Sequence, residues 1–536
     1  MKKYHADVVI VGTGIAGAMC AYSLAKKGLR VIALDAGPRI KRHEIVSGFQ
    51  STHKLDLSAG YPNSDHAPRP DWGGEDTYLK QTGTDILRTE YLRLVGGTTW
   101  HWGGTCPRFL PVDFKMKSAY NIADDWPLSY NDLESYYAQA EKELGVSGQQ
   151  TQNALQEGAG FRSTKYPMPA IAPTYSEQKI MAAIEGKSNL RFNPRPISRN
   201  SRPYKDRVQC QGFGTCSPIC PSGAKYSAIV HIEQAEELGA QVLDNMLVDR
   251  IVKNKDNHIT SVKGRYKAQE PFEVFGKVIV IAANGIETPR LLLMSADDHE
   301  PNGVANGSGQ VGKNLMDHPG LLCRFLMPEP VYNGRGPENM VVCETYRDHE
   351  ERAEKAGWML STNNALPLHD LTADLLNKEY VGKPLNESLK DYAERFAQFT
   401  ISTEQLPHPD NSVSVDFHEK DRAGQPKIKL NYGFKSYEKK ALEAMKGQFK
   451  NILKMINAEL LSIGEPFSQH HLMGTTRMGH DAKRYVADSD GRSYAHSNLF
   501  FAGSSLFTTG GTANPSLTIA ALALRTSDVI YAQLKA

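Results

Sequence analysis

Short apolar runs alternate with polar stretches along this chain of 536 residues. Four of the runs are brief and rich in β-branched or aromatic residues, which is typical of strands buried on both faces of a parallel sheet. They cover residues 7–11, 31–34, 278–283 and 499–503. The pattern also predicts helices over residues 18–26 and 517–534.

A longer stripe of apolar residues recurs at helical spacing toward the C-terminal end. It consists of Leu442, Met445, Phe449, Ile452, Leu453, Ile456 and Leu460. An apolar face with this period packs on a core. We interpret the stripe as core packing up to Leu460, without a role in chemistry.

Composition and charge exclude several classes of function. The chain is 40% hydrophobic and 23% charged, as in ordinary globular proteins. Its net charge is +2, which does not support nucleic acid or an anionic membrane as a partner. No apolar run reaches the roughly 18 residues of a membrane span. Residues 1–5 lead into a strand without a signal-peptide core, so we expect no export signal in this chain.

A glycine pattern follows the first strand. Gly12, Gly14 and Gly17 form G-x-G-x-x-G between strand and helix, and Asp35 ends the next strand. Gly12 allows the tight turn, Gly14 lets the backbone approach a pyrophosphate, and Gly17 lets helix and strand pack closely. The helix N-terminus attracts the phosphates, and the Asp35 carboxylate accepts from ribose hydroxyls. The pattern predicts a bound dinucleotide but does not separate NAD from FAD.

Three of the seven cysteines cluster within eleven residues, as Cys210, Cys216 and Cys220-Pro221. This distribution does not fit a disulfide framework. Zinc usually takes four ligands, and no fourth Cys or obvious His lies nearby in the sequence. Three thiolates followed by proline indicate an iron–sulfur cluster, and [3Fe–4S] needs only three cysteines. The alternative is a set of buried structural thiols.

Two adjacent histidines are candidates for acid–base catalysis. Alcohol oxidation needs a base for the hydroxyl proton, and histidine titrates near neutral pH. His470-His471 lies in a Ser-Gln-His-His-Leu-Met-Gly-Thr segment. The alternative is a pair of ordinary surface or core histidines.

Four further segments carry a family resemblance. Residues 95–104 and 282–289 resemble the two signature segments of the glucose-methanol-choline (GMC) flavoproteins, and residues 502–504 and 510–515 resemble their flavin-contacting end. The resemblance implies an α/β fold, with a Rossmann-like FAD domain interleaved with a sheet-based α+β substrate domain. The FAD domain would comprise residues 1–110, 206–320 (with the cysteines) and 461–536, and the substrate domain 111–205 and 321–460. Two domains then replace the three to four that length alone suggests.

The same resemblance implies roles for individual residues. His471 matches the histidine that faces the flavin and acts as base, and Asn514 matches the second active-site position, which orients the substrate oxygen. His470 would tune the substrate pocket or merely adjoin it. His101 leaves two alternatives, covalent attachment of FAD or packing beside non-covalent FAD. The remaining residues expected to contact FAD are Gly97, Gly103, Gly104, Ala283, Gly503 and Pro515.

A closer resemblance surrounds the cysteines. Residues 200–204 and 220–226, with 125–127 and 314–320, resemble the large catalytic subunits of bacterial FAD-dependent glucose, fructose and sorbitol dehydrogenases. This implies a [3Fe–4S] cluster on Cys210, Cys216 and Cys220, a small chaperone-like subunit and a multihaem cytochrome c. Membrane association would come only through these partners. The small subunit would carry the folded chain to the periplasmic face of the inner membrane; without such a partner the chain would stay in the cytoplasm.

The sequence therefore predicts a dehydrogenase that oxidises a hydroxyl of a sugar, polyol or sugar acid. His470, Arg477 and Gly103-Gly104-Thr105 depart from the glucose and fructose enzymes, which leaves the substrate open. The alternatives are an oxidase that uses O₂, a glycoside 3-dehydrogenase with another acceptor, a redox-silent lyase and an electron-transfer subunit without a substrate.

Overall fold

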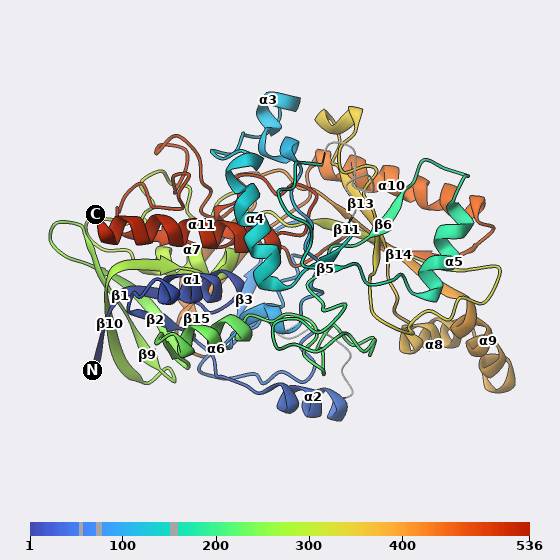
Figure 1. Ribbon diagram of the computed structural model, residues 1–536, viewed down its shortest axis with the longest axis horizontal. Coiled ribbons are helices and arrows are strands. Elements are labelled where there is room, and N and C mark those ends of the chain that lie inside the picture. The colour runs from blue at the N-terminus through green and yellow to red at the C-terminus, as the bar shows by residue number, and fades with distance from the viewer. Residues whose placement is uncertain (53–56, 71–77, 151–158) are drawn as a thin grey trace.

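Two large sheets dominate the computed structural model, which describes residues 1–52, 57–70, 78–150 and 159–536. They lie toward opposite ends of the molecule (Figure 1), and both chain termini are at the end that holds the first sheet. In spatial order the first sheet contains β7 (Gln241–Leu243), β2 (Val31–Leu34), β1 (Lys2–Val11), β10 (Glu270–Ile281), β9 (Ile259–Tyr266) and β8 (Met246–Lys253), with β19 (Leu499–Phe501) also beside β10.

The centre of the first sheet confirms the predicted buried parallel strands. β1 pairs in parallel with β2 and with β10. Val9, Ile10 and Val280 are fully buried, as their β-branched side chains require at a sheet covered on both faces. Along its other edge, β10 pairs antiparallel with β9 over its first half and parallel with β19 at its end.

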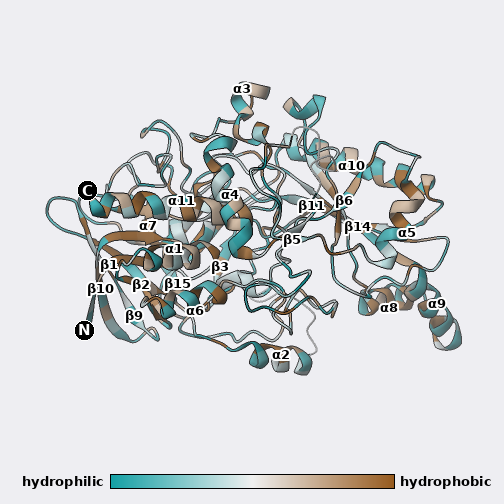
Figure 2. Cartoon of the chain, in the orientation of Figure 1, coloured by the Kyte–Doolittle hydropathy of each residue, from teal (hydrophilic) through white to brown (hydrophobic). Residues whose placement is uncertain are grey.

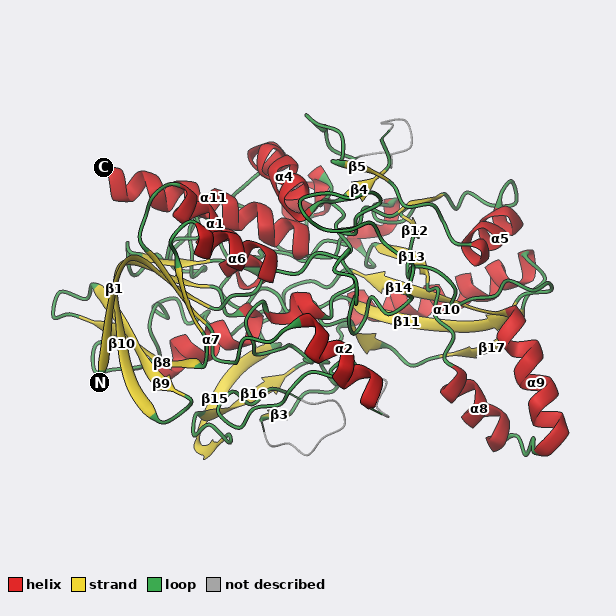
Figure 3. Cartoon of the chain, turned by 60° about the horizontal axis from the view of Figure 1, so that its bottom comes forward, coloured by secondary structure: helices red, strands yellow, loops and turns green. Residues whose placement is uncertain are grey.

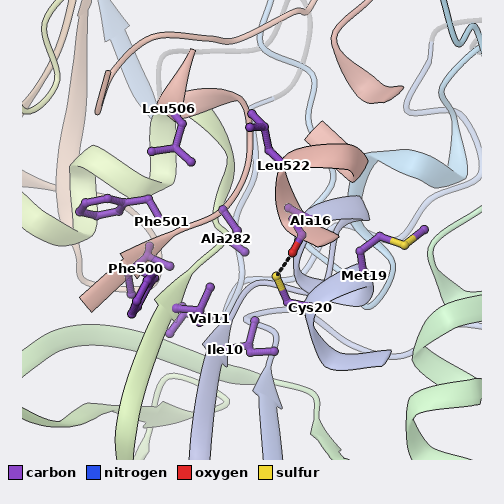
Figure 4. Packing of buried hydrophobic residues seen from close by; sticks show 14 of the residues in the cluster. Ile10, Val11, Ala16, Met19, Cys20, Ala282, Phe500, Phe501, Leu506 and Leu522 are labelled. Atoms are coloured by element: carbon purple, nitrogen blue, oxygen red, sulfur yellow. Dashed lines mark hydrogen bonds between the residues drawn. The ribbon is translucent and has the colours of Figure 1, made fainter. Parts of the chain in front are cut away.

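Helices cover both faces of this sheet (Figure 3). On one side α1 (Ile15–Lys26) packs against α6 (Ile229–Glu237) and α11 (Ser516–Lys535), and α4 (Tyr130–Leu144) packs on α11. On the other side lies α7 (Asn284–Met294). In the core shown in Figure 4, the Cys20 thiol of α1 donates to the carbonyl oxygen of Ala523 on α11 at 3.6 Å.

The second sheet is antiparallel and builds the other half of the molecule. Its strands are, in order, β17 (Glu459–Ile463), β11 (Pro319–Leu326), β14 (Phe396–Thr403), β13 (Trp358–Thr362), β12 (Val341–Cys343) and β6 (Phe192–Pro194), with β18 (Phe467–Ser468) also beside β11. The helices around it are α5 (Tyr175–Ile184), α8 (Leu368–Asn377), α9 (Gly382–Arg395) and α10 (Ser436–Met455). In Figure 2 the outer helix α9, which buries no residue, is largely hydrophilic.

The apolar stripe is core packing as predicted, with one correction at its end. On α10, Phe449 stacks on Phe399 of β14 with 6.4 Å between ring centroids. The helix ends at Met455, because Asn457 adopts a left-handed conformation with φ of 54°. Leu460 therefore lies on β17, where it is 40% exposed, and does not belong to the helical face.

Smaller elements complete the described chain. A third sheet of β15 (Ser412–Lys420), β16 (Pro426–Asn431) and β3 (Leu79–Gln81) lies against α7. The remaining regular elements include α2 (Arg42–Ser51), α3 (Met116–Tyr120) and the short pair β4 (Ser147–Gly148) and β5 (Met168–Pro169). All strands of the first sheet come from the predicted FAD-domain segments, while the domain boundaries stay a prediction. No helix among the described residues has both the length and the apolar run that a bilayer crossing requires.

Candidate active site

A cavity of about 490 Å³ opens at the carboxyl ends of β1, β2 and β10. This is where open α/β sheets bind their ligands. Its walls contain nearly all site residues expected from the sequence: Gly12, Gly14, Asp35, Gly97, His101, Gly103, Gly104, Ala283, His470, His471, Gly503, Asn514 and Pro515. Segments far apart in the chain thus meet at one site.

The glycine turn has the geometry of a phosphate cradle. Gly12 has a φ of 100°, and a Cβ there would lie 2.5 Å from the carbonyl oxygen of Ala282. A Cβ on Gly17 would lie 1.9 Å from the Gly12 oxygen, so this glycine serves close packing and does not line the cavity. Gly14, in contrast, faces open space within 4 Å, and it begins α1 without a side-chain cap. The first N–H groups of the helix therefore remain available to an anion.

Asp35 lies beside this cradle. One carboxylate oxygen accepts from the Thr13 hydroxyl at 2.5 Å, and the other accepts from the backbone N–H of Gly37 at 3.1 Å. Burial raises the pKa of Asp35, against the hydrogen bonds from Thr13 and Gly37 that lower it. An open phosphate site and a fixed carboxylate at the end of β2 fit the pyrophosphate and ribose of a dinucleotide.

His101 lies in the wall formed by residues 97–104. Its Nδ1 is 2.8 Å from the carbonyl oxygen of Leu57. A carbonyl only accepts, so Nδ1 carries the hydrogen and Nε2 carries the lone pair. Burial lowers the pKa of His101 to about 3, which keeps the ring neutral. This geometry is compatible with both alternatives for His101.

The predicted catalytic pair is brought together, and a third residue joins it. Asn514 Nδ2 lies 3.2 Å from His471 Nε2. On the other side of the ring, His471 Nδ1 lies 2.7 Å from Nδ1 of His318. His318 Nε2 lies 2.9 Å from the carbonyl oxygen of Gly511. The histidines connect Asn514 to the backbone in one row.

This row determines the tautomers. The Gly511 carbonyl can only accept, so His318 carries its hydrogen on Nε2 and, as a neutral ring, presents a lone pair on Nδ1. The hydrogen between the two rings therefore belongs to His471 Nδ1. Nε2 of His471 is left as the acceptor, to which the Asn514 amide donates. Burial, with further effects of His318 and His470, lowers the pKa of His471 well below its usual value, so the ring is a neutral base at neutral pH.

Asp317 holds the backbone of the predicted catalytic segment. Its carboxylate accepts from the N–H groups of His471 at 2.7 Å, His470 at 3.1 Å and His318 at 2.6 Å. Burial raises the pKa of Asp317 to about 6, against these hydrogen bonds. The carboxylate thus fixes both histidine-bearing segments relative to one another.

His470 lines the same cavity but lies outside the row of hydrogen bonds. Its φ of 65° is rare for a residue other than glycine and indicates a strained backbone. Its Nε2 lies 3.5 Å from a carboxylate oxygen of Glu90. Burial lowers the pKa of His470 to about 4. The structure therefore places His470 in the cavity wall, next to the predicted base.

A polar face of the second sheet forms the opposite wall. Alternate residues of β13 and β14 point into the cavity while their neighbours are buried in the core, as the two-residue period of a strand requires. The cavity-lining residues are Ser361, Asn363, Thr400 and Ser402. The Ser402 hydroxyl donates to the side-chain oxygen of Gln469, directly before the two histidines, at 2.5 Å. The wall is rich in groups that bind hydroxyls.

The three clustered cysteines line one small pocket on the other side of the 97–104 segment. Cys216 and Cys220 are buried, Cys210 is half-buried, and all three are free thiols. Among the described residues, no three His, Cys, Asp or Glu side chains are arranged to hold a metal ion. A polynuclear cluster differs, because its cysteines bind different iron atoms and need only to open on a common pocket.

Cations surround this pocket. Burial raises the pKa of Cys220, but the Lys225 N–H, the Ser222 hydroxyl and the charges of Lys225 and Arg42 outweigh it, and the net shift is downward. Lys225 Nζ donates to the carbonyl oxygens of Trp100, Trp102 and Cys216. Burial raises the pKa of Cys216, so these surroundings favour the thiolate at Cys220. Three cysteines that open on one pocket are the type of donor set that an iron–sulfur cluster uses.

Sequence reasoning did not assign roles to several residues that the structure places at the site. His318 and Asp317 lie in an Asp-His-Pro motif, which in the sequence marks only the family resemblance. The polar wall is a property of strand pairing, and no local pattern reveals it. Arg195, at the far end of this wall, follows a three-residue strand and has no motif of its own.

Models of the GMC oxidoreductase family match this chain twice, over residues 7–320 and 407–523. The fructose dehydrogenase large subunit of Gluconobacter japonicus is 36% identical, covering 100% of this chain and 99% of that protein. The gluconate 2-dehydrogenase flavoprotein of Pantoea cypripedii is 24% identical over 98% of this chain and 94% of its own. A formate oxidase structure from Aspergillus oryzae RIB40 shares the fold, with a TM-score of 0.68, 14% identity, and coverage of 100% of this chain and 99% of its own.

Proposed function

This chain belongs to the GMC oxidoreductase family, and we propose that it is an FAD-dependent dehydrogenase that oxidises a hydroxyl of a sugar, polyol or sugar acid. The observation that carries the proposal is the His471–Asn514 pair opposite the polar wall of β13 and β14. A neutral histidine, whose Nε2 lone pair accepts from the Asn514 amide, meets a surface of hydroxyl and amide groups there. The similarity to a fructose and a gluconate dehydrogenase supports the same substrate class.

His471, Asn514 and His318 have different roles in the proposed reaction. His471 Nε2 accepts the proton of the substrate hydroxyl, because its other nitrogen already carries a hydrogen held by His318. Asn514 holds the substrate oxygen beside that nitrogen. When His471 becomes charged, its Nδ1–H remains bonded to the neutral His318 ring, which stabilises the cation. FAD bound between Gly14 and Gly104 would supply the hydride acceptor.

We further propose that Cys210, Cys216 and Cys220 hold a [3Fe–4S] cluster. The pocket that they line is adjacent to the FAD cavity: Ser217 lines the cavity while Cys216 lines the cysteine pocket, and Arg199 Nη2 donates to the Gly103 oxygen at 3.0 Å. Such a cluster would supply a one-electron carrier. The fructose enzyme is named as a large subunit, which supports a multi-subunit assembly. We propose that the other members are a small subunit and a cytochrome c, and that the chain is exported to the periplasm with the small subunit.

Anaerobic reduction of the flavin tests the enzymatic function. The purified protein is mixed with a panel of sugars, polyols and sugar acids, and the flavin absorbance is followed. Bleaching by at least one of them, absent in His471→Ala with full FAD content, supports the proposal. A flavin that none of them reduces would exclude it. In air, a dehydrogenase should reduce an added dye without forming peroxide, whereas an oxidase should form peroxide.

Separate measurements test the cluster, its partners and the flavin linkage. About three iron atoms per anaerobically purified chain are expected, and Cys216→Ser should lose them. An iron content below about one atom per chain would refute the cluster. Co-expression with a candidate small subunit and a candidate cytochrome c, followed by fractionation of the cells, tests assembly and export. Acid precipitation tests His101: covalent FAD stays with the protein pellet, and non-covalent FAD is released.

A further inference from the structure

Arg195 is a buried cation in the wall of the substrate cavity. It directly follows β6, where its backbone N–H donates to the Met340 oxygen at 2.8 Å, and the residue is part of the cavity lining. The residue is only 7% exposed. Burial lowers the pKa of Arg195 to about 10, so the guanidinium still carries its charge at neutral pH.

Within the described chain no carboxylate forms an ion pair with Arg195. The carboxylates whose charges act on Arg195 are Glu344, which pairs with Arg347, and Glu177. Both oxygens of Glu177 are already used, by the N–H of Met340 on one side and by Thr174 on the other. A buried charge that the fold leaves without a counter-ion costs free energy unless a ligand supplies one.

The guanidinium also has unused donors. Nη2 donates to the Ser361 hydroxyl and, at 3.4 Å, to the Val341 oxygen. Nε is buried without a partner among the described residues, and no bond of Nη1 is found there. Several other arginines, Arg199 among them, also leave Nε unpaired, but Arg199 adjoins the cysteine pocket. Arg195 differs because it lines the large cavity, together with its hydrogen-bond partner Ser361.

The hydrogen-bonded wall connects Arg195 with the catalytic histidines. Arg195 contacts Ser361, which is opposite Thr400 in the pairing of β13 with β14. Two residues further along β14, about 7 Å at the usual rise of a strand, Ser402 contacts Gln469. A polyol chain lying on these hydroxyls would have one end at His471 and the other at Arg195.

We infer that Arg195 binds the carboxylate of a sugar acid whose hydroxyl is oxidised at His471. This inference rests on the proposed function and narrows it to a substrate class. A guanidinium fork binds a carboxylate through two parallel hydrogen bonds. At Arg195 such a fork must include Nη2, so the carboxylate would replace the 3.4 Å contact of Nη2 with the Val341 oxygen. The Ser361 hydroxyl fixes the orientation of the fork.

Gluconate and sorbitol form a matched pair of probes, because they share a hydroxylated six-carbon chain and differ at C1, where one has a carboxylate and the other a CH₂OH group. We expect kcat/KM for gluconate to exceed that for sorbitol by about 10- to 100-fold, the usual effect of hydrogen bonds to a charged group. In Arg195→Met this ratio should fall at least tenfold, mainly through the KM of gluconate. Arg195→Lys, which keeps the charge without the fork, should retain part of the preference.

A binding measurement covers the case of a poorly folding variant. Gluconate should raise the melting temperature of the FAD-loaded wild-type protein more than sorbitol does, and Ser361→Ala should reduce the difference. Equal ratios for wild type and Arg195→Met, or a preference for neutral polyols, would overturn the inference while the dehydrogenase function stands. A preference for glucose 6-phosphate over gluconate would overturn the choice of carboxylate. If no compound of the panel reduces the flavin, the proposed function fails first.

Discussion

His318 offers the sharpest test of the proposed catalytic geometry, because it contacts the proposed base, His471, without lining the cavity. Its Nδ1 accepts the hydrogen of His471 Nδ1 at 2.7 Å, inside the protein. When His471 takes the substrate proton, this becomes a hydrogen bond from a cation, worth about 1.5–3 kcal/mol. His318→Phe keeps the ring but removes the acceptor. The loss converts to a fall of about 10- to 150-fold in kcat.

The matched control is His318→Asn, whose side-chain oxygen can occupy the place of Nδ1 and accept from His471. It should restore a large part of kcat. The assay is steady-state dye reduction with FAD content measured on each sample. Because His318 makes no contact with substrate in this geometry, KM should change much less than kcat. Equal kcat for Phe and Asn variants, or an effect confined to KM, would refute the tautomer argument.

Three further predictions follow from other parts of the site. Gly14→Val should abolish FAD binding with little change in the melting temperature of the apoprotein, because Gly14 faces open space. Gly17→Ala should instead destabilise the fold, because its Cβ would clash with the Gly12 oxygen. Flavin absorbance measures the first effect and calorimetry the second. The pKa of His471 lies well below 6.5, so kcat/KM should show no loss that follows an ordinary histidine between pH 7 and 6; an acid limb near 6.5 would contradict the burial of the base. Burial also lowers the pKa of His101 from 6.5 to about 3, so between these pH values the unfolded chain binds a proton that the folded chain does not. The contribution of His101 to the free energy of unfolding should therefore decrease by about 1.4 kcal/mol for each pH unit below 6.5, down to about pH 3. His101→Gln should give a shallower pH dependence in chemical unfolding, and an unchanged pH dependence would mean that His101 is protonated in the folded protein.

The parts of this structure that local sequence patterns determine were predictable. The strands around Val9 and Val280 are buried on both faces, so their apolar runs carry a clear signal. Gly12, Gly14 and Asp35 have spacings that one turn and one helix impose. The end of α10 was not predictable from periodicity, because Leu460 continues the helical spacing although Asn457 has already ended the helix.

The residues of the proposed substrate wall could not be predicted from local sequence patterns. Ser361, Thr400 and Arg195 become neighbours only through the pairing of strands that are distant in the sequence, and each is an ordinary residue in its local context. His318 could have been recognised as more than a family mark, because a histidine in an Asp-His-Pro motif is a second titratable group near the predicted base. What its ring does, however, depends on which nitrogen faces Gly511, and only the three-dimensional arrangement provides that.

The two-sided pairing of β10 has a consequence for how the protein is made. Val278 pairs with Val8 on one edge, and Ile279 pairs with Leu499 on the other, so the cavity floor joins segments from the beginning, middle and end of the chain. Contacts of such long sequence separation form slowly. A ribosome adding about 5–20 residues per second must complete nearly the whole chain before Asn514 can face His471. We therefore expect the cofactor to bind late, after translation. A nascent or C-terminally truncated chain should leave the end of β10, around Ile279, without its β19 partner and should not hold flavin.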